Sequence, residues 1–112
     1  MHEYGVALEI ARMAMENAGS RKIMKINLRI GDLSGVAGES IAMYCDLIFR
    51  EKQPEKAVEV AIERVAATFL CTCGERYESE RIFNPCPACG SFERSVVDGN
   101  QCTIESIEVE DE

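Results

Sequence analysis

Apolar side chains recur at helical spacing in two stretches of the chain. In residues 3–18 the apolar positions lie three or four apart and form two adjoining stripes, made of Val6, Ile10, Met13, Ala7, Ala11, Ala14 and Ala18. Gly19 follows as a residue suited to end a helix. Residues 38–52 repeat this spacing before Pro54, with one face made of Ile41, Tyr44, Cys45 and Ile48. Both stretches are therefore predicted to be amphipathic helices that pack on a core.

Alternation of apolar and polar residues predicts the strands. The first covers residues 24–30, ends in the turn-forming segment 31–35, and has an apolar face made of Met24, Ile26, Leu28 and Ile30. Another covers residues 57–69 but changes phase, since its apolar positions are Val58, Val60 and Ile62, then Val65, Ala67 and Phe69. One inserted residue near Glu63-Arg64, a β-bulge, explains the change.

The last strand also changes phase. Cys102 and Ile104 share one parity, whereas Ile107 and Val109 share the other, so an irregularity is expected near Glu105-Ser106. If this strand pairs antiparallel with residues 57–69, the two irregularities fall opposite each other. We therefore expect these two strands to be antiparallel neighbours.

The element order predicts an α+β fold in which two helices pack on a three-stranded sheet. Residues 70–94 contain four of the six cysteines, have no clear periodicity, and form an insertion that resembles a zinc ribbon. The expected organisation is one α+β domain, residues 1–69 with 95–112, and a metal-binding module, residues 70–94. A hydrophobic content of 46% is sufficient for one core.

The charge distribution limits the partners. The net charge is −8, Lys and Arg are scattered, and residues 105–112 are acidic. Nucleic acid binding requires a clustered basic surface, so cations or basic protein surfaces are the expected partners. No apolar run approaches the roughly 20 residues of a membrane span. Residues 1–18 lack the basic start of a signal peptide, so we expect a cytoplasmic protein.

The cysteine pairs predict a zinc site. Cys86 and Cys89 stand two residues apart and precede a glycine, which is typical of a zinc-binding turn, but only Thr72 separates Cys71 from Cys73. Four thiolates form a closed structural zinc site, although a disulfide or free thiols remain the alternative for such pairs. Leu70 stands where two-residue spacing would put the first sulfur. The two remaining cysteines, Cys45 and Cys102, are expected to be buried apolar residues, but Cys102 could replace Cys71 as a ligand if Cys71 is badly placed.

A second candidate site lies at the start of the chain. His2 is the sole histidine and lies one residue from the α-amine of Met1. The amine, the intervening amide nitrogen and the imidazole can hold one ion in fused chelate rings, and planar nitrogen ligation suits Ni(II) or Cu(II). Glu3 supplies the next amide and a carboxylate. A histidine at a frayed terminus without a function is the alternative.

Together these motifs resemble the HypA/HybF family of hydrogenase-maturation nickel metallochaperones. The resemblance covers essentially the whole chain and rests on Met1-His2-Glu3, Ile30-Gly31, Cys73-Gly74, Cys86-Pro87-x-Cys89 and Ser106-Ile107-Glu108. It implies nickel at His2 and the adjoining backbone with Glu3 beside it, and structural zinc at Cys71, Cys73, Cys86 and Cys89. It also implies delivery to the NiFe-hydrogenase large subunit precursor together with the nickel-binding GTPase of the pathway, and in some organisms a role in urease maturation. The first cysteine pair departs from the family, which usually spaces it by two residues.

The leading hypothesis is therefore a nickel carrier rather than an enzyme. The chain has no Ser/His/Asp or Cys/His catalytic set and no phosphate-binding glycine-rich loop. A zinc hydrolase is disfavoured because four thiolates leave no open position for water. The main alternative is a zinc-ribbon adaptor that recruits a basic protein without transferring metal. Assembly of several copies into a homo-oligomer is left open.

Overall fold

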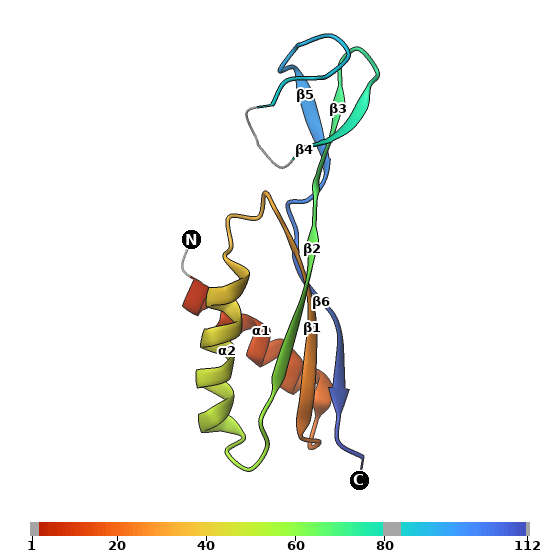
Figure 1. Ribbon diagram of the computed structural model, residues 1–112. Coiled ribbons are helices and arrows are strands. Elements are labelled where there is room, and N and C mark those ends of the chain that lie inside the picture. Colours follow the sequence, from red (N-terminus) through yellow and green to blue (C-terminus); the bar gives the residue numbers. More distant parts are fainter. Residues whose placement is uncertain (1–2, 80–83, 112) are drawn as a thin grey trace.

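The computed structural model describes residues 3–79 and 84–111, and it has the predicted α+β architecture (Figure 1). The larger part consists of two helices on one face of a three-stranded sheet, formed by α1 (Glu3–Ala18), β1 (Ile23–Gly31), α2 (Gly38–Lys52), β2 (Glu59–Val65) and β6 (Cys102–Val109). A second three-stranded sheet projects from one end and contains β3 (Ala67–Cys71), β4 (Arg76–Ser79) and β5 (Arg94–Asp98). The molecule is elongated, with extents of 56 × 25 × 16 Å.

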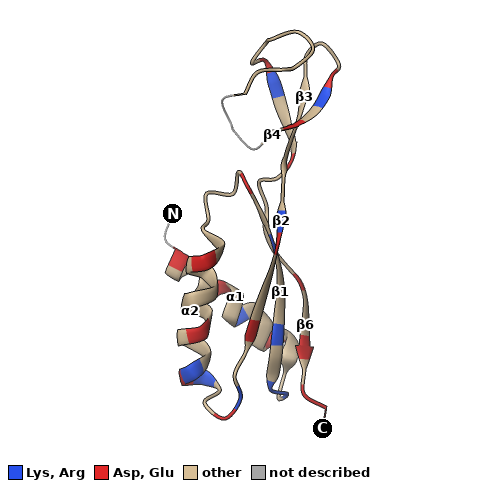
Figure 2. Ribbon diagram, viewed as in Figure 1, with Lys and Arg blue, Asp and Glu red and all other residues tan. Residues whose placement is uncertain are grey.

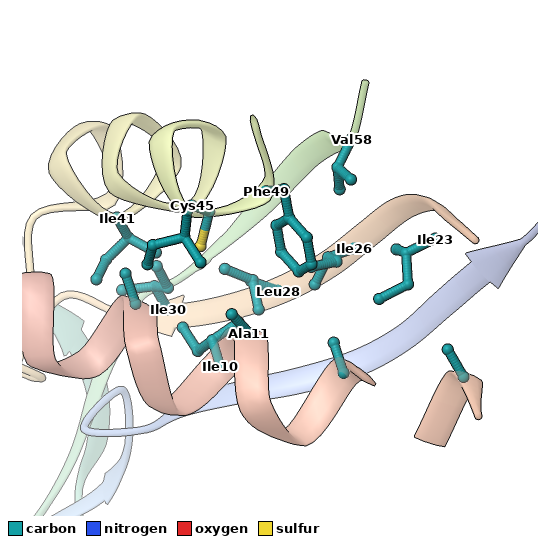
Figure 3. Close-up of a cluster of buried hydrophobic side chains, with 14 residues drawn as sticks. Ile10, Ala11, Ile23, Ile26, Leu28, Ile30, Ile41, Cys45, Phe49 and Val58 are labelled. Carbon is teal, nitrogen blue, oxygen red and sulfur yellow. The ribbon is translucent and has the colours of Figure 1, made fainter. Parts of the chain in front are cut away.

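Both predicted helices form with the expected bounds. Gly19 ends α1 with φ of 65°, and its amide donates to the Met15 carbonyl at 3.1 Å. The helix stripes and the inner face of β1 meet in the main core (Figure 3), whose largest members include Ile10, Ile26, Leu28, Ile41 and Phe49. Met13 was expected in this stripe but is 40% exposed. Among the described residues, neither helix is long and apolar enough to cross a membrane.

Gln53 is a buried polar residue that the pattern did not predict to be in the core. It follows α2 and is 6% exposed. Its side chain accepts a hydrogen bond from the Ile23 amide at 2.8 Å and donates to the Ile23 carbonyl at 2.7 Å and the Lys56 carbonyl at 3.0 Å. It therefore ties the start of β1 to the chain that follows α2.

The expected apolar face of the first strand is wrong at one position. Met24 is 41% exposed, whereas Ile23 is 1% exposed and occupies the core. The pairing of β1 with β6 explains the difference, because Ile23 stands opposite Val109 and Lys25 opposite Glu108, which leaves Met24 without a partner. This β-bulge reverses the side-chain alternation at the beginning of the strand.

The expected pairing of residues 57–69 with the last strand is also wrong for the main sheet. Its strand order is β2-β1-β6, so β2 and β6 lie on opposite sides of β1. β2 runs parallel to β1 in an unbroken register, and no bulge occurs at Glu63-Arg64. The apolar positions change phase because the chain leaves one sheet at Val65 and enters the other at Ala67.

Two parts of the expected strand pairing are confirmed, the irregularity in the last strand and an antiparallel pair across the cysteine-rich segment. The register of β6 shifts between Ser106 and Ile104, so the irregularity near Glu105 exists, but the partner strand is β1. Antiparallel pairing across the cysteine-rich segment occurs between β3 and β5. The second sheet therefore extends beyond residues 70–94 at both ends.

Close backbone packing joins the two sheets. The Gly31 amide donates to the Gln101 carbonyl, and the Leu33 amide to the Gly99 carbonyl, both at 2.7 Å. Leu33 packs on the core of the second sheet. A Cβ atom at Gly99, where φ is 103°, would lie 2.7 Å from the Ala67 Cα atom. Only glycine fits at this point of contact.

Replacing Gly99 by alanine is expected to destabilise the protein more than replacing Gly35. Both residues have positive φ, but a Cβ at Gly35 would meet nothing within 4 Å. The conformational cost alone is about 1–2 kcal/mol, and the overlap at Gly99 adds about 1–3 kcal/mol. Chemical unfolding of the wild type and the two variants measures this difference. Equal losses at the two positions would contradict close packing at the junction.

Candidate metal centre

Strand alternation determines which residue of the first cysteine pair faces inward. Ala67, Phe69 and Cys71 are buried along β3, whereas Leu70 is 42% exposed on the other face. A cysteine at position 70 would therefore point away from the buried face of β3, on which Cys71 lies. Cys71 is 3% exposed at the end of the strand, where it begins a tight turn.

This turn accommodates the unusually short spacing. Gly74 has φ of 96°, its amide donates to the Cys71 carbonyl at 2.9 Å, and the Cys71 amide donates to the Glu75 carbonyl at 2.9 Å. The chain therefore reverses within four residues, which brings the Cys73 sulfur back toward the cluster.

The second pair lies in a similar turn. The Gly90 amide donates to the Cys86 carbonyl at 2.8 Å, and the Cys86 amide donates to the Ser91 carbonyl at 2.9 Å. Gly90 has a positive φ of 75°, and Gly74 in the first turn also has a positive φ, of 96°. Cys86 is 2% exposed, whereas Cys89 lies at the surface.

The two turns bring four sulfur atoms together. The sulfurs of Cys71, Cys73, Cys86 and Cys89 all lie within 4.8 Å of one another. The Cys71 and Cys89 sulfurs are 3.5 Å apart, and those of Cys73 and Cys86 are 3.7 Å apart. A tetrahedral zinc ion with Zn–S bonds of about 2.3 Å requires sulfur separations of about 3.8 Å. The arrangement fits one zinc ion.

Backbone amides point at the sulfurs. The Cys73 amide donates to the Cys71 sulfur and lowers the pKa of that thiol to about 7. The Glu75 amide acts in the same direction on Cys73, but the Cys71 sulfur, burial and the other two thiols outweigh it and raise the pKa of Cys73 to about 12. Four thiolates this close repel one another, so a divalent cation is the natural complement to the set.

The other two cysteines lie outside this cluster. Cys45 is fully buried on α2, and burial raises the pKa of its thiol to about 11. Cys102 stands opposite Ile30 in the main sheet and packs on the main core. Replacement of Cys71 by Cys102 was expected only if Cys71 were badly placed, and Cys71 lies with the other three sulfurs.

Only part of the predicted N-terminal site can be located. Met1 and His2 lie outside the described residues, whereas Glu3 is the first residue of α1. Its carboxylate accepts a hydrogen bond from the Ala37 amide at 3.3 Å, immediately before α2. Glu3 therefore holds the beginning of α1 against the loop that follows β1.

Sequence reasoning missed Arg94 near the cysteines. This residue begins β5, a strand that the pattern did not predict, and its Cα is the cross-strand partner of Cys71. Its guanidinium donates to the Tyr77 hydroxyl at 3.0 Å. The alternation in residues 94–98 is too short to have revealed the strand.

Comparison with known proteins places the chain in a family. A family model described as "Hydrogenase/urease nickel incorporation, metallochaperone, hypA" matches residues 1–109. The hydrogenase maturation factor HypA of Geobacter metallireducens is 35% identical over 111 residues, which cover 98% of this chain and 100% of that protein. The corresponding factor of one Dehalococcoides mccartyi strain is 35% identical over 116 residues, with 100% of this chain and 97% of that protein covered.

Solved structures have the same fold. The solution structure of the nickel metallochaperone HypA from Helicobacter pylori aligns with a TM-score of 0.59 at 18% identity, over 97% of each chain. A second solution structure of a HypA protein aligns with a TM-score of 0.62 at 21% identity, over 97% of this chain and 96% of that one. The family match, the relatives and the shared fold agree, and the chain belongs to the HypA family of nickel-incorporation metallochaperones.

Proposed function

We propose that this protein carries Ni(II) at its N-terminus and releases it during NiFe-hydrogenase maturation. The ligands are the Met1 amine, the His2 imidazole and the backbone amide nitrogens of the first residues, with Glu3 beside them. The observation that carries the proposal is that Glu3, the first described residue, already belongs to α1, so the proposed ligands adjoin the N-terminal end of a helix. The first amides of a helix have no partner within the helix, so those at this end remain available to a metal. A site at the end of the chain also permits ligand exchange with a recipient.

The four clustered cysteines are proposed to hold one structural zinc ion. Zinc takes four thiolates in a closed tetrahedral site, and the sulfur separations of 3.5 and 3.7 Å support this choice. Such a site keeps no open position for a substrate or for nickel in transit. Its role is to maintain the shape of the second sheet as a surface for a partner.

The proposed recipient is the hydrogenase large subunit precursor, and the proposed co-worker is the nickel-binding GTPase of the same pathway. A role in urease maturation is compatible with the family description. The cytoplasm is the proposed compartment, because it keeps thiols reduced.

Surface charge supports basic protein partners rather than polyanions. Lys and Arg are scattered along the described ribbon among more numerous Asp and Glu residues (Figure 2). Arg12 pairs with Glu16 at 2.6 Å, and Arg64 forms two hydrogen bonds to Asp32 at 2.6 and 2.7 Å. Such pairing leaves an excess of carboxylates, in agreement with the net charge of −8.

A short Gly-Ser extension ahead of Met1 is expected to abolish stoichiometric Ni(II) binding. The extension must be several residues long, because it has to move the α-amine out of reach of the His2 imidazole. Zinc content and thermal stability should remain unchanged, since the four cysteines belong to the second sheet and its loops, whereas Glu3, the first described residue, belongs to α1. Calorimetric titration with Ni(II) measures the effect.

The matched control carries the same extension after Glu112 and should bind Ni(II) as the wild type does. Undiminished nickel binding by the N-terminally extended protein would exclude the amine as a ligand. In that case an adaptor function without nickel transfer would become the better hypothesis.

A further inference from the structure

Arg94 lies on the same face of the second sheet as the buried ligand Cys71. The two residues stand directly opposite each other in the antiparallel pair of β3 and β5. Directly opposite residues of such a pair project to the same side. Arg94 therefore brings a fixed positive charge to the inner side of the sheet, beside the strand that ends at Cys71.

Among the described residues, the Arg94 guanidinium contacts three separate segments in and beside the second sheet. It stacks over the Phe69 ring of β3 with 4.2 Å to the ring centroid. It donates to the Tyr77 hydroxyl of β4 at 3.0 Å. It also donates to the carbonyl of Asn84, which lies two residues before Cys86. One side chain thus connects the strand that ends in the first cysteine pair with the segment that leads to the second.

These contacts use properties that arginine has and lysine lacks. A guanidinium is planar, so it can stack on a ring while its edge donates several hydrogen bonds in fixed directions. The Phe92 ring also lies near the guanidinium, with its centroid 5.7 Å from the guanidinium carbon. A side chain that both stacks on Phe69 and donates to the Asn84 carbonyl must therefore be planar and carry several N–H donors.

Charge distinguishes the two faces of the second sheet. Four thiolates together with one Zn²⁺ ion carry a net charge of −2. Within residues 67–79 and 84–98, the basic residues are Arg76 and Arg94. Arg76 stands opposite Leu70, which is exposed, so Arg76 projects from the other face of the sheet. Arg94 is the described cation on the ligand side.

We infer that Arg94 is a positioning residue of the tetrathiolate centre, which holds the two cysteine turns at the separation that zinc requires. The inference rests on the proposed structural zinc. Residues that orient metal ligands without binding the metal commonly change metal affinity by about 10- to 100-fold when they are replaced. Arg94 fits this role through the Tyr77 and Asn84 contacts, and not through a bond to the ion.

The test compares zinc loss from Arg94→Met, Arg94→Lys and the control Arg76→Met with loss from the wild type. A strong chelator is added to each full-length protein, and the rate of zinc transfer is followed. Arg94→Met should lose zinc roughly 10- to 100-fold faster, and Arg76→Met should match the wild type. Arg94→Lys should recover only part of the difference, since it keeps the charge but not the planar donor.

Cobalt substitution separates positioning from general unfolding. In Co(II)-loaded Arg94→Met, the sulfur-to-cobalt charge-transfer intensity of four thiolates should remain, while the ligand-field bands shift because the tetrahedron is less constrained. Tyr77→Phe, which removes one acceptor and keeps the ring, should accelerate zinc loss by a smaller factor. This variant provides a second measurement if Arg94→Met does not fold.

Equal zinc-loss rates in the wild type, Arg94→Met and Tyr77→Phe would overturn the inference. Full recovery by Arg94→Lys would overturn the requirement for a planar donor. A wild-type protein without zinc would instead refute the proposed zinc site, so the two failures are distinguishable.

Discussion

Cys86→Ala is expected to lose zinc and unfold the second sheet while the main core remains folded. Among the described residues, the core of the second sheet contains five buried members, Ala67, Phe69, Cys71, Tyr77 and Cys86. Two of these five are proposed ligands, so little apolar burial remains to stabilise the sheet without the ion. Structural zinc contributes an apparent ~10–16 kcal/mol in small modules, which exceeds what such a core can supply. Loss of one ligand should therefore disorder residues of β3, β4 and β5 together.

Metal analysis and amide hydrogen exchange measure this result. Amides of the second sheet should exchange rapidly in Cys86→Ala, while those of β1 and α2 keep much of their protection. The matched control is Cys102→Ser, which should retain one zinc per chain because Cys102 lies outside the sulfur cluster. Zinc retained by Cys71→Ser but lost from Cys102→Ser would show that the fourth ligand is misassigned.

His2→Ala is expected to abolish stoichiometric Ni(II) binding without unfolding the chain. The described contacts of α1 with the main core begin at Val6 and Ala7, so we expect the fold to tolerate loss of the His2 side chain. Removal of the imidazole leaves the Met1 amine without the second anchor that makes an amide nitrogen a nickel ligand. Calorimetry should detect Ni(II) binding by the wild type alone, and both proteins should contain the same amount of zinc.

Nickel binding should also depend on pH with a defined sign. The metal competes with protons for the imidazole, with an unperturbed pKa of about 6.5, and for the α-amine, with a pKa of about 7.7–8.0. Protonation of both groups rises as pH falls, so affinity should decrease steeply between about pH 7.5 and pH 6. Zinc held by four thiolates should remain bound over this interval. Equal nickel affinity in wild type and His2→Ala would remove His2 from the site.

The sequence predicted those elements whose periodicity extends over many turns. The two helices have the expected bounds because their apolar stripes span four turns each and a glycine or proline follows each stripe. The cysteine pairs predicted the site by composition, and the structure brings the four sulfurs within 4.8 Å of one another. Local spacing was sufficient here, because each pair lies within a single turn of the chain.

Strand partners could not be predicted in the same way. The alternation of residues 57–69 indicates which side chains are buried, but not which strand lies beside them. The phase change after Ile62 has two explanations, a bulge or a move to another sheet, and both leave the same pattern in the sequence. The structure has the second, since β2 ends at Val65 and β3 begins at Ala67.

The amino-acid pattern was sufficient to predict the two helices, the α+β class, the family resemblance and the four cysteines whose sulfurs lie together. Three features became visible only in the folded chain: β1 is the central strand, Ile23 replaces Met24 in the core, and Cys71 rather than Cys102 joins the cluster. The structure also revealed that Arg94 stands opposite Cys71. The physical reason is that periodicity records burial along one segment. Hydrogen-bond register and close backbone contacts depend on segments far apart in the chain.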